Sequence, residues 1–453
     1  MKKAFAVLLS LFLLLACAPT ALAAEDKLVV YNWADYIYDI ELTEFKAYYK
    51  QTTGREIDVT YVTFDTNETM LTKVLKGNAQ VDVICPSEYA IQRLMESNAL
   101  RKLNYFTDES FVNSDKINPD IVTKIRESFS DLEQDMTEYM APYMWGTLGI
   151  LYNADKIDSA DAEAAGWGLL WNLQQNGTAV GALDKKIYMK DSIRDSYCAV
   201  LLYMKERNLL PEAYASMSVQ TLINTVDDTL LALAKETLIS QKESLYGYEV
   251  DFGKNELIAG TAWVDLAWSG DALYAIEEAE AEGVNLQYFT PESGANIWFD
   301  GWVIPNNCQN EEAARLFIDF MNRPDIAMKN MMEIGYSSAV DAEALRQSEE
   351  AIAVLAEAYA DDPEDEQEVA ELAEAYLSNP VRYPNVNDDT LGVMRDFGVH
   401  NEQVVVMWES VRGSNISVVS ILLVLAAVLV VLAAAFAVFT LTNKKKRRRV
   451  KAS

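Results

Sequence analysis

Short apolar runs alternate with amphipathic segments after Lys27, and this alternation restricts the possible folds more than any other feature. Strand-like patterns cover residues 27–33, 56–64 and 81–86, and helical patterns cover 41–54, 67–78 and 88–100. Gly54 is expected to end the first of these helices, and Asp65 and Glu68 have the spacing of a capping box for the second. Repeated units of this kind predict an α/β fold, with helices covering the faces of a sheet.

A second α/β region begins at residues 141–153 and continues through 185–191 and a helix at 195–207 to 261–273. The strand-like stretch NIWFDGWVIP follows at 296–305, and then a helix at 311–327 that we expect Arg323 and Pro324 to end. Residues 341–379 are acidic and helical. Their run DDPEDEQE lacks the Gly and the spacing of a calcium loop, so we interpret it as a solvated face.

The two ends of the chain have the composition of targeting and membrane segments. Residues 1–23 have a basic start, a short apolar stretch and a small-residue end, which predicts an export signal. LLAC, ending at Cys17, also resembles a lipoprotein signal, although cleavage after Ala23 is the preferred interpretation. Residues 416–442 carry no charge and exceed the roughly 20 residues that span a bilayer, so they predict a transmembrane helix. The basic tail at 443–453 then lies in the cytoplasm and the rest of the chain outside.

The formal net charge of the whole chain is −31. Seven of its 38 Lys and Arg residues lie in the tail and two in the export signal, which leaves 29 against 69 acids, a charge near −40 for the exported part. This charge argues against nucleic acid and favours either cationic partners or a plain solvated acidic surface.

Cysteine and histidine are too scarce for several kinds of chemistry. After the signal only Cys85, Cys198 and Cys308 remain, too few and too scattered for a disulfide framework or a zinc cluster, and we expect them in the core. His400 is the only histidine, so a His-based triad or a multi-His metal site is excluded. No cofactor is expected.

Five stretches combine an aromatic residue with an acid or a hydroxyl where a predicted strand ends. They contain Trp33, Asp35 and Tyr36; Ser87 and Tyr89; Asp191, Ser192 and Asp195; Trp268 and Asp271; and Trp298 and Asp300. Each stretch alone could belong to the core. Ligands of open α/β sheets bind at the carboxyl ends of strands, so we expect these loops to converge on one cleft.

The stretch at 296–305 places a carboxylate among aromatic residues. In a strand, Trp298, Asp300 and Trp302 share one face. A buried carboxylate needs a partner. A linear polyamine would supply one, because its ammonium groups pair with carboxylates while its methylene stems lie on aromatic rings. We therefore expect a ligand ammonium to be the partner of Asp300.

Several motifs resemble the periplasmic spermidine/putrescine-binding proteins, the PotD family of receptors for polyamine ABC importers. They are VVYNWADYI, TNETM, VDVICPSEY, PYMWGT, AWSGDA, IWFDGWVIP, NRPDIA and IGYSS. The resemblance covers roughly residues 27–340 well and 380–412 weakly. It implies a two-lobed type II solute-binding fold with a hinge, crossed near Ala141 and Ile297, and Asp300 beside that hinge. Residues 27–140 and 298–340 would form lobe 1, residues 141–297 lobe 2, and 341–413 the acidic segment and the return to lobe 2.

The resemblance also implies roles for individual residues. The implied ligand contacts are Trp33, Asp35, Tyr36, Ser87, Tyr89, Ser192, Asp195, Trp268, Trp298, Asp300 and Tyr336. Asp300 would hold an inner amine, and Asp35 and Asp195 terminal or neighbouring amines. Ser192 replaces an acid that the family often has, and a late glutamine contact would fall near Arg395, which is unsuitable beside a cation.

The resulting hypothesis is a membrane-tethered polyamine receptor that delivers its ligand to an ABC permease and is no enzyme. Two alternatives remain open from the residues. One is a membrane-tethered sensor, whose transmembrane helix would transmit the closure of the lobes on the ligand to the cytoplasm. The other is a glycosidase with paired carboxylates, which also places aromatic residues beside acids.

Overall fold

The structure is a computed structural model that describes residues 25–77, 79–172 and 183–413. The predicted export signal, the predicted transmembrane segment 416–442 and the basic tail lie outside these residues and stay predictions. Within the described ranges, no helix is both long and apolar enough to span a bilayer.

The first lobe contains the parallel strands β1 (Asp26–Trp33), β2 (Ile57–Phe64) and β3 (Val83–Ile84). Helices α2 (Ile40–Thr53), α3 (Asn67–Leu75) and α4 (Glu88–Glu96) alternate with them, as predicted. Gly54 ends α2 in the left-handed conformation with φ 73°. The expected cap at Asp65 is wrong by one residue: α3 begins at Asn67, and the extended Thr66 accepts the hydrogen bond from the backbone N–H of Thr69.

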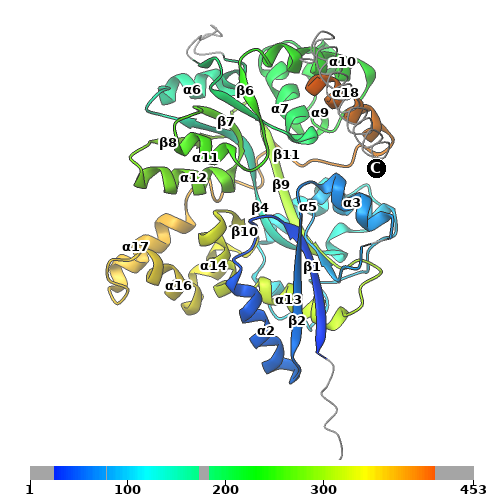
Figure 1. Ribbon diagram of the computed structural model, residues 1–453, viewed down its shortest axis with the longest axis vertical. Coiled ribbons are helices and arrows are strands. Elements are labelled where there is room, and N and C mark those ends of the chain that lie inside the picture. The colour runs from blue at the N-terminus through cyan, green and yellow to red at the C-terminus, as the bar shows by residue number, and fades with distance from the viewer. Residues whose placement is uncertain (1–24, 78, 173–182, 414–453) are drawn as a thin grey trace, which may run out of the picture.

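Two long antiparallel strands connect the first lobe to the second. The start of β4 (Met140–Asn153) pairs with β9 (Ala295–Val303) from Met140 to Thr147. From Leu148 onward β4 pairs instead with β7 (Val264–Trp268). Both strands run from one lobe into the other (Figure 1). This connection gives the predicted two-lobed α/β architecture.

The second lobe contains the strands β5 (Ile187–Lys190), β6 (Leu245–Glu249), β7 and β8 (Leu286–Phe289). The strand order of the whole sheet is β2-β1-β3-β9-β4-β7-β5-β6, with β8 and β10 on β4 and β11 on β9. The remaining elements of the lobes are α5 (Pro119–Ser128), α6 (Ser159–Ala165), α7 (Ile193–Glu206), α8 (Glu212–Ala215), α9 (Val219–Leu222), α10 (Asp228–Gln241), α11 (Gly253–Ile258), α12 (Ser269–Ala281), β10 (Ser337–Ser338) and β11 (Leu391–Gly392).

The predicted helix break at Arg323 and Pro324 is confirmed, and it separates two helices. Helix α13 (Glu311–Met321) ends before it, and Pro324 occupies the first turn of α14 (Pro324–Ile334), where its missing N–H is tolerated. The acidic segment forms α15 (Ala342–Arg346), α16 (Glu349–Tyr359) and α17 (Glu366–Leu377), which project from the first lobe beside α14 (Figure 1). Helix α18 (Asn401–Gly413) then packs on α10 of the second lobe.

Cys85, Cys198 and Cys308 are buried free thiols, as predicted. Trp302 is fully buried, and its ring lies 4.6 Å from that of Tyr143 and 5.3 Å from that of Phe317. It therefore belongs to the core of the first lobe.

Candidate ligand-binding site

A cavity of about 370 Å³ lies between the lobes, within the range of small-molecule sites. We call it the interlobe cavity. Its walls include residues at or just after the ends of β1, β3, β5 and β7, residues of β9 and α18, and the residue before β10. All eleven residues predicted as ligand contacts line it: Trp33, Asp35, Tyr36, Ser87, Tyr89, Ser192, Asp195, Trp268, Trp298, Asp300 and Tyr336.

Asp300 of β9 is the buried carboxylate in this cavity. It is 6% exposed, and among the described residues its Oδ1 atom has no hydrogen-bond partner. The indole Nε1 of Trp298, which also lines the cavity, likewise lacks a partner there. Such unsatisfied buried groups are rare in native proteins, so their meeting in one cavity calls for an external partner.

Burial raises the pKa of Asp300 to about 7, and the nearby charge of Asp195 acts in the same direction. The hydroxyls of Ser87 and Tyr36 partly oppose this rise. Burial likewise raises the pKa of the neighbouring Glu88 to about 8, although its Oε2 accepts a 2.9 Å hydrogen bond from the backbone N–H of Phe299. The site therefore holds a carboxylate that titrates near neutrality.

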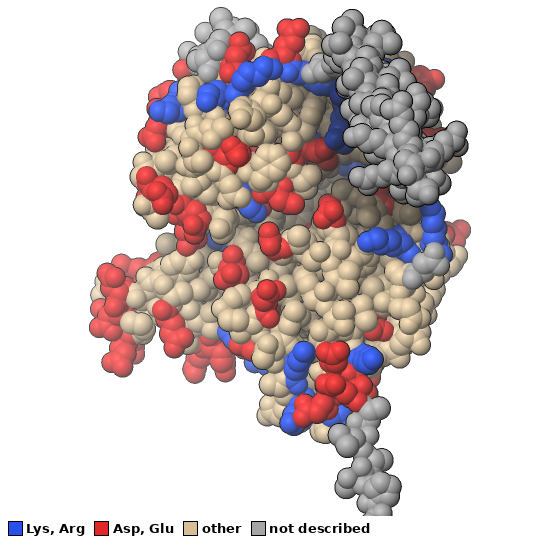
Figure 2. All heavy atoms as spheres, in the orientation of Figure 1, with Lys and Arg blue, Asp and Glu red and all other residues tan. Residues whose placement is uncertain are grey.

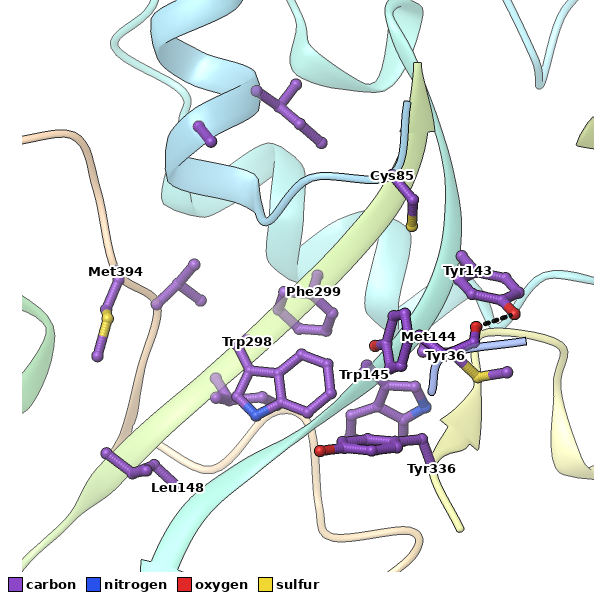
Figure 3. Close-up of a cluster of buried hydrophobic side chains, with 14 of the residues drawn as sticks. Tyr36, Cys85, Tyr143, Met144, Trp145, Leu148, Trp298, Phe299, Tyr336 and Met394 are labelled. Atoms are coloured by element: carbon purple, nitrogen blue, oxygen red, sulfur yellow. Dashed lines mark hydrogen bonds between the residues drawn. The ribbon is translucent and has the colours of Figure 1, made fainter. Parts of the chain in front are cut away.

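Aromatic rings surround Asp300 on the first-lobe side. The ring centroid of Tyr336 lies 5.1 Å from that of Tyr36 and 5.6 Å from that of Trp298, both edge to face. Figure 3 shows these three rings grouped beside β9, with the Tyr143 hydroxyl donating a 2.9 Å hydrogen bond to the backbone oxygen of Tyr36. This bond holds the loop that carries Tyr36 against the core.

Asn67 positions two of the predicted residues and escaped the sequence analysis. Its Nδ2 donates to the Ser87 hydroxyl at 3.0 Å and to the Tyr89 hydroxyl at 2.9 Å. The motif TNETM contains Asn67, so that motif was its available signal. Asp35 is exposed, with a left-handed backbone at φ 48°. The turn that follows β1 thus places an exposed acid at the cavity.

Ser192 and Asp195 lie at the start of α7 in the second lobe. The Ser192 hydroxyl accepts from the backbone N–H of Asp195 at 3.4 Å, so Ser192 serves as the helix cap. Asp195 is buried, which raises its pKa, while hydrogen bonds from Ser192 and Trp268 oppose the rise. Asp195 therefore faces Asp300 as a second desolvated acid.

Helix α18 contributes lining residues that the sequence analysis missed, namely Trp408, Glu409 and Arg412. The Arg412 guanidinium lies 3.2 Å from the carboxylate of Asp191, which also lines the cavity. Nothing in the local pattern of α18 distinguishes these residues from a helix surface, because only the packing of α18 brings them to the cavity.

Two charged residues that the sequence analysis placed near the site, Asp271 and Arg395, pair with other protein groups. Asp271 lines the cavity, but the ammonium of Lys254 lies 2.9 Å from its Oδ1 atom. Arg395 does not line the cavity: its Nη1 lies 2.7 Å from Asp131 of the first lobe, and Met394 lines the cavity instead. The cation that was expected to disturb this end of the site is therefore directed elsewhere.

Acidic side chains lie on both sides of the groove between the lobes and crowd the projecting helices α16 and α17 (Figure 2). Within the ranges that the structure describes, no group of His, Cys, Asp and Glu has an arrangement suited to a metal ion. The negative field of the groove suits a cationic organic ligand.

This fold, with a cavity between two lobes joined by β4 and β9, is that of a solute-binding protein. A model of the bacterial extracellular solute-binding proteins matches residues 44–364, so the chain belongs to this family. The putrescine-binding periplasmic protein SpuD of Pseudomonas aeruginosa is 28% identical over 333 residues, 72% of this chain and 82% of SpuD. The spermidine/putrescine-binding periplasmic protein of Salmonella typhimurium is 26% identical over 313 residues, 69% of this chain and 77% of that protein.

Among solved structures, the spermidine/putrescine ABC transporter substrate-binding protein PotD of Streptococcus pneumoniae is similar, with a TM-score of 0.58 and 27% identity. The match covers 86% of this chain and 100% of PotD. The comparisons give no support to the glycosidase or to the sensor.

Proposed function

We propose that this chain is the polyamine receptor of an ABC importer, binding a linear polyamine in the interlobe cavity and delivering it to a permease. One observation carries the proposal. The buried carboxylate of Asp300, which has an oxygen without a partner in the described residues, lies among the aromatic rings of Trp298, Tyr36 and Tyr336.

Each kind of lining residue suits one part of such a ligand. Asp300 and Asp195 accept from ammonium groups, and Asp35 offers a third carboxylate at the exposed turn after β1. The rings of Trp33, Trp268 and Trp298 cover methylene stems, and a cation over such a ring gains about 0.5–2 kcal/mol. The hydroxyls of Ser87, Tyr89 and Ser192 complete the polar contacts.

The relatives support the same ligand class, because their names describe putrescine or spermidine binding. The PotD structure is described as part of an ABC transporter, which supports a permease as the partner. Membership of the solute-binding family supports a binding protein over an enzyme.

The proposal also covers a hinge between the two lobes near Ala141 and Ile297 and a membrane tether formed by residues 416–442. Pairing of β4 first with β9 and then with β7 supports a hinge through these strands. The uncharged sequence 416–442 supports an anchor that would hold the receptor near its permease and raise its effective concentration there. The binding lobes would then lie outside the membrane, with the basic tail in the cytoplasm.

Isothermal titration calorimetry of the full chain tests the proposal with putrescine, spermidine, spermine and 1,4-butanediol. The expected result is binding of the amines and none of the diol, because the diol has the same stem without charge. Thermal stabilisation by a neutral sugar in the absence of any amine binding would contradict the proposed function.

A further inference from the structure

Two lysine ammonium groups of the protein lie beside Asp271, at the Trp268 wall of the interlobe cavity. Lys190 ends β5, and its side chain is 1% exposed. Its Nζ atom lies 4.4 Å from the ring centroid of Trp268. Lys254, near the start of α11, is 18% exposed and lines the cavity itself. Both lysines come from the second lobe.

The two lysines neutralise the same carboxylate from both sides. Lys254 Nζ lies 2.9 Å from Asp271 Oδ1, and Lys190 Nζ lies 3.7 Å from Asp271 Oδ2. Lys190 is further held by an ion pair with Glu249 and donates a 2.8 Å hydrogen bond to the backbone oxygen of Val250. Asp271 is therefore not available to a ligand, although its sequence motif resembles that of the other site acids.

Asp300 and Asp195 differ from Asp271 in this respect. In the part of the chain that the structure describes, neither forms an ion pair with a lysine or arginine within 4.0 Å. Both are buried, and one oxygen of Asp300 has no hydrogen-bond partner there. Among the buried aspartates of the cavity, Asp271 is thus paired with lysines, whereas Asp300 and Asp195 are not.

The position of Lys190 also changes what Trp268 can do. One side of this ring already carries an ammonium group, and the Lys254 ammonium is close to Asp271 on the same wall. A ligand ammonium placed beside Trp268 would have to compete with these two lysines for Asp271 and Glu249, whereas a methylene stem would not. The Trp268 wall of the cavity therefore suits a methylene stem of the ligand better than a ligand ammonium group.

On the basis of the proposed function, we infer that Lys254, supported by Lys190, takes the place of a ligand ammonium at Asp271 and makes the cavity favour a diamine over a triamine. A diamine has ammonium groups for the unpaired acids alone. The third ammonium of a triamine must approach Lys254 or pair with an exposed acid such as Asp35, and exposed ion pairs contribute little. Lys254 is then the specificity-determining residue, because it is the lysine that lines the cavity.

Calorimetry of the full chain with putrescine and spermidine tests the inference through the ratio of the two dissociation constants. Lys254→Gln releases one oxygen of Asp271 toward the cavity, so spermidine affinity should rise relative to putrescine by at least about threefold. Lys186→Gln is the matched control: it removes the same charge from the second lobe, where Lys186 donates to the backbone oxygen of Thr261 at 2.8 Å outside the cavity. This control should leave the ratio unchanged.

Two further variants separate specificity from a structural effect. Lys254→Arg keeps a cation beside Asp271 and should retain the wild-type ratio. Lys254→Gln combined with Asp271→Asn should cancel the gain in spermidine affinity, because the released carboxylate is gone. Melting temperatures report whether each variant is folded.

An unchanged ratio in folded Lys254→Gln, or an equal change in Lys186→Gln, would overturn the inference while the proposed function stands. A wild-type protein that binds neither amine would overturn both.

Discussion

The guanidinium of Arg194, on α7 of the second lobe, lies 3.8 Å from the ring centroid of Tyr89, on α4 of the first lobe. Its distance to the ring of Phe397 is 4.2 Å, so the cation lies between two aromatic residues at the boundary of the lobes. It also donates to the backbone oxygen of Arg395 at 2.6 Å. The contact between Arg194 and Tyr89 therefore joins the two lobes at the wall of the cavity.

Replacing Arg194 with Met should therefore shift the ligand-free protein toward an open arrangement. The variant keeps a long side chain but loses the cation–aromatic contacts, so polyamine affinity should fall by about three- to tenfold as the closed population falls. Small-angle X-ray scattering should show a larger ligand-free radius of gyration, and calorimetry should show the loss of affinity. Arg323→Met is the control, because Arg323 lies over Tyr48 and Phe320 within the first lobe. An unchanged radius and affinity in Arg194→Met would contradict a role in closure.

Putrescine affinity should rise with pH through neutrality. The pKa of Asp300 is raised from 3.8 to about 7, so below pH 7 the carboxylate is largely protonated and cannot pair with an ammonium. Calorimetry at pH 5.5, 7 and 8.5 should show the increase, and titrations in buffers of different ionisation enthalpy should show proton release near pH 7. Asp300→Asn should remove the proton release. A pH-independent affinity would exclude Asp300 as the titrating anchor.

The carboxyl groups of Asp300 and Glu88 should make the ligand-free protein less stable as the pH rises. A raised pKa means that the folded state holds a proton that the unfolded state has lost. The stabilising contributions of Asp300 and Glu88 are therefore complete below their unfolded pKa values and are lost as the pH passes about 7 and about 8. Thermal melting without ligand should show a decrease between about pH 4 and 8. A smaller decrease is expected in Asp300→Asn.

The elements of the fold could be predicted because their signals are local. Gly54 ends α2 and Pro324 separates two helices through backbone restrictions that each residue carries on its own. The sequence did not identify Thr66 as the N-cap of α3. The spacing of Asp65 and Glu68 does not determine the first helical residue, which is Asn67.

The candidate site was predictable as a set of motifs, and its charge pairing was not. Trp298 and Asp300 stand out because aromatic and acidic residues alternate along one strand. Lys190, Lys254 and Asp271 lie in three separate segments, so only the packing of α11 and α12 on β7, the neighbour of β5, brings the charges together. For the same reason the contribution of α18 became visible only in three dimensions.

A chain that ends after Gly413 should bind polyamines as tightly as the full chain, whereas one that ends after His400 should not bind. The first keeps α18, whose Trp408 ring lies 5.3 Å from that of Tyr248 and lines the cavity. The second exposes that wall to water. Calorimetry on both truncations provides the comparison. Equal binding by the two would show that α18 is dispensable.

Binding should weaken as the salt concentration rises, because a multiply charged cation enters an acidic cavity and added ions screen that attraction. Spermidine affinity measured at about 0.05 and 0.5 M NaCl should fall more steeply than putrescine affinity, since spermidine carries one more charge. The same slope for both amines would argue against charge as the main source of attraction.

Asp300→Asn should weaken polyamine binding at least tenfold and leave the ligand-free protein as stable as before, or more stable. Asn keeps the size and hydrogen-bonding capacity of the side chain but removes its charge. Losing one partner of a desolvated charged pair costs about 2–5 kcal/mol, whereas an exposed pair contributes less than about 1 kcal/mol. In the ligand-free state the substitution instead removes a buried charge that has no cationic partner within the described residues.

Asp319→Asn is the matched control for this prediction. Asp319 is also buried, but its Oδ1 accepts from the backbone N–H of Asn113 at 3.0 Å and its Oδ2 from the Asn113 side chain at 3.0 Å. An Asn at this position brings an amide group against those donors, so Asp319→Asn should lower the melting temperature and bind normally. Asp300→Asn should show the opposite pattern when affinity and ligand-free melting are measured on both variants. Normal affinity with a lowered melting point in Asp300→Asn would show that Asp300 serves the fold and is not the amine anchor.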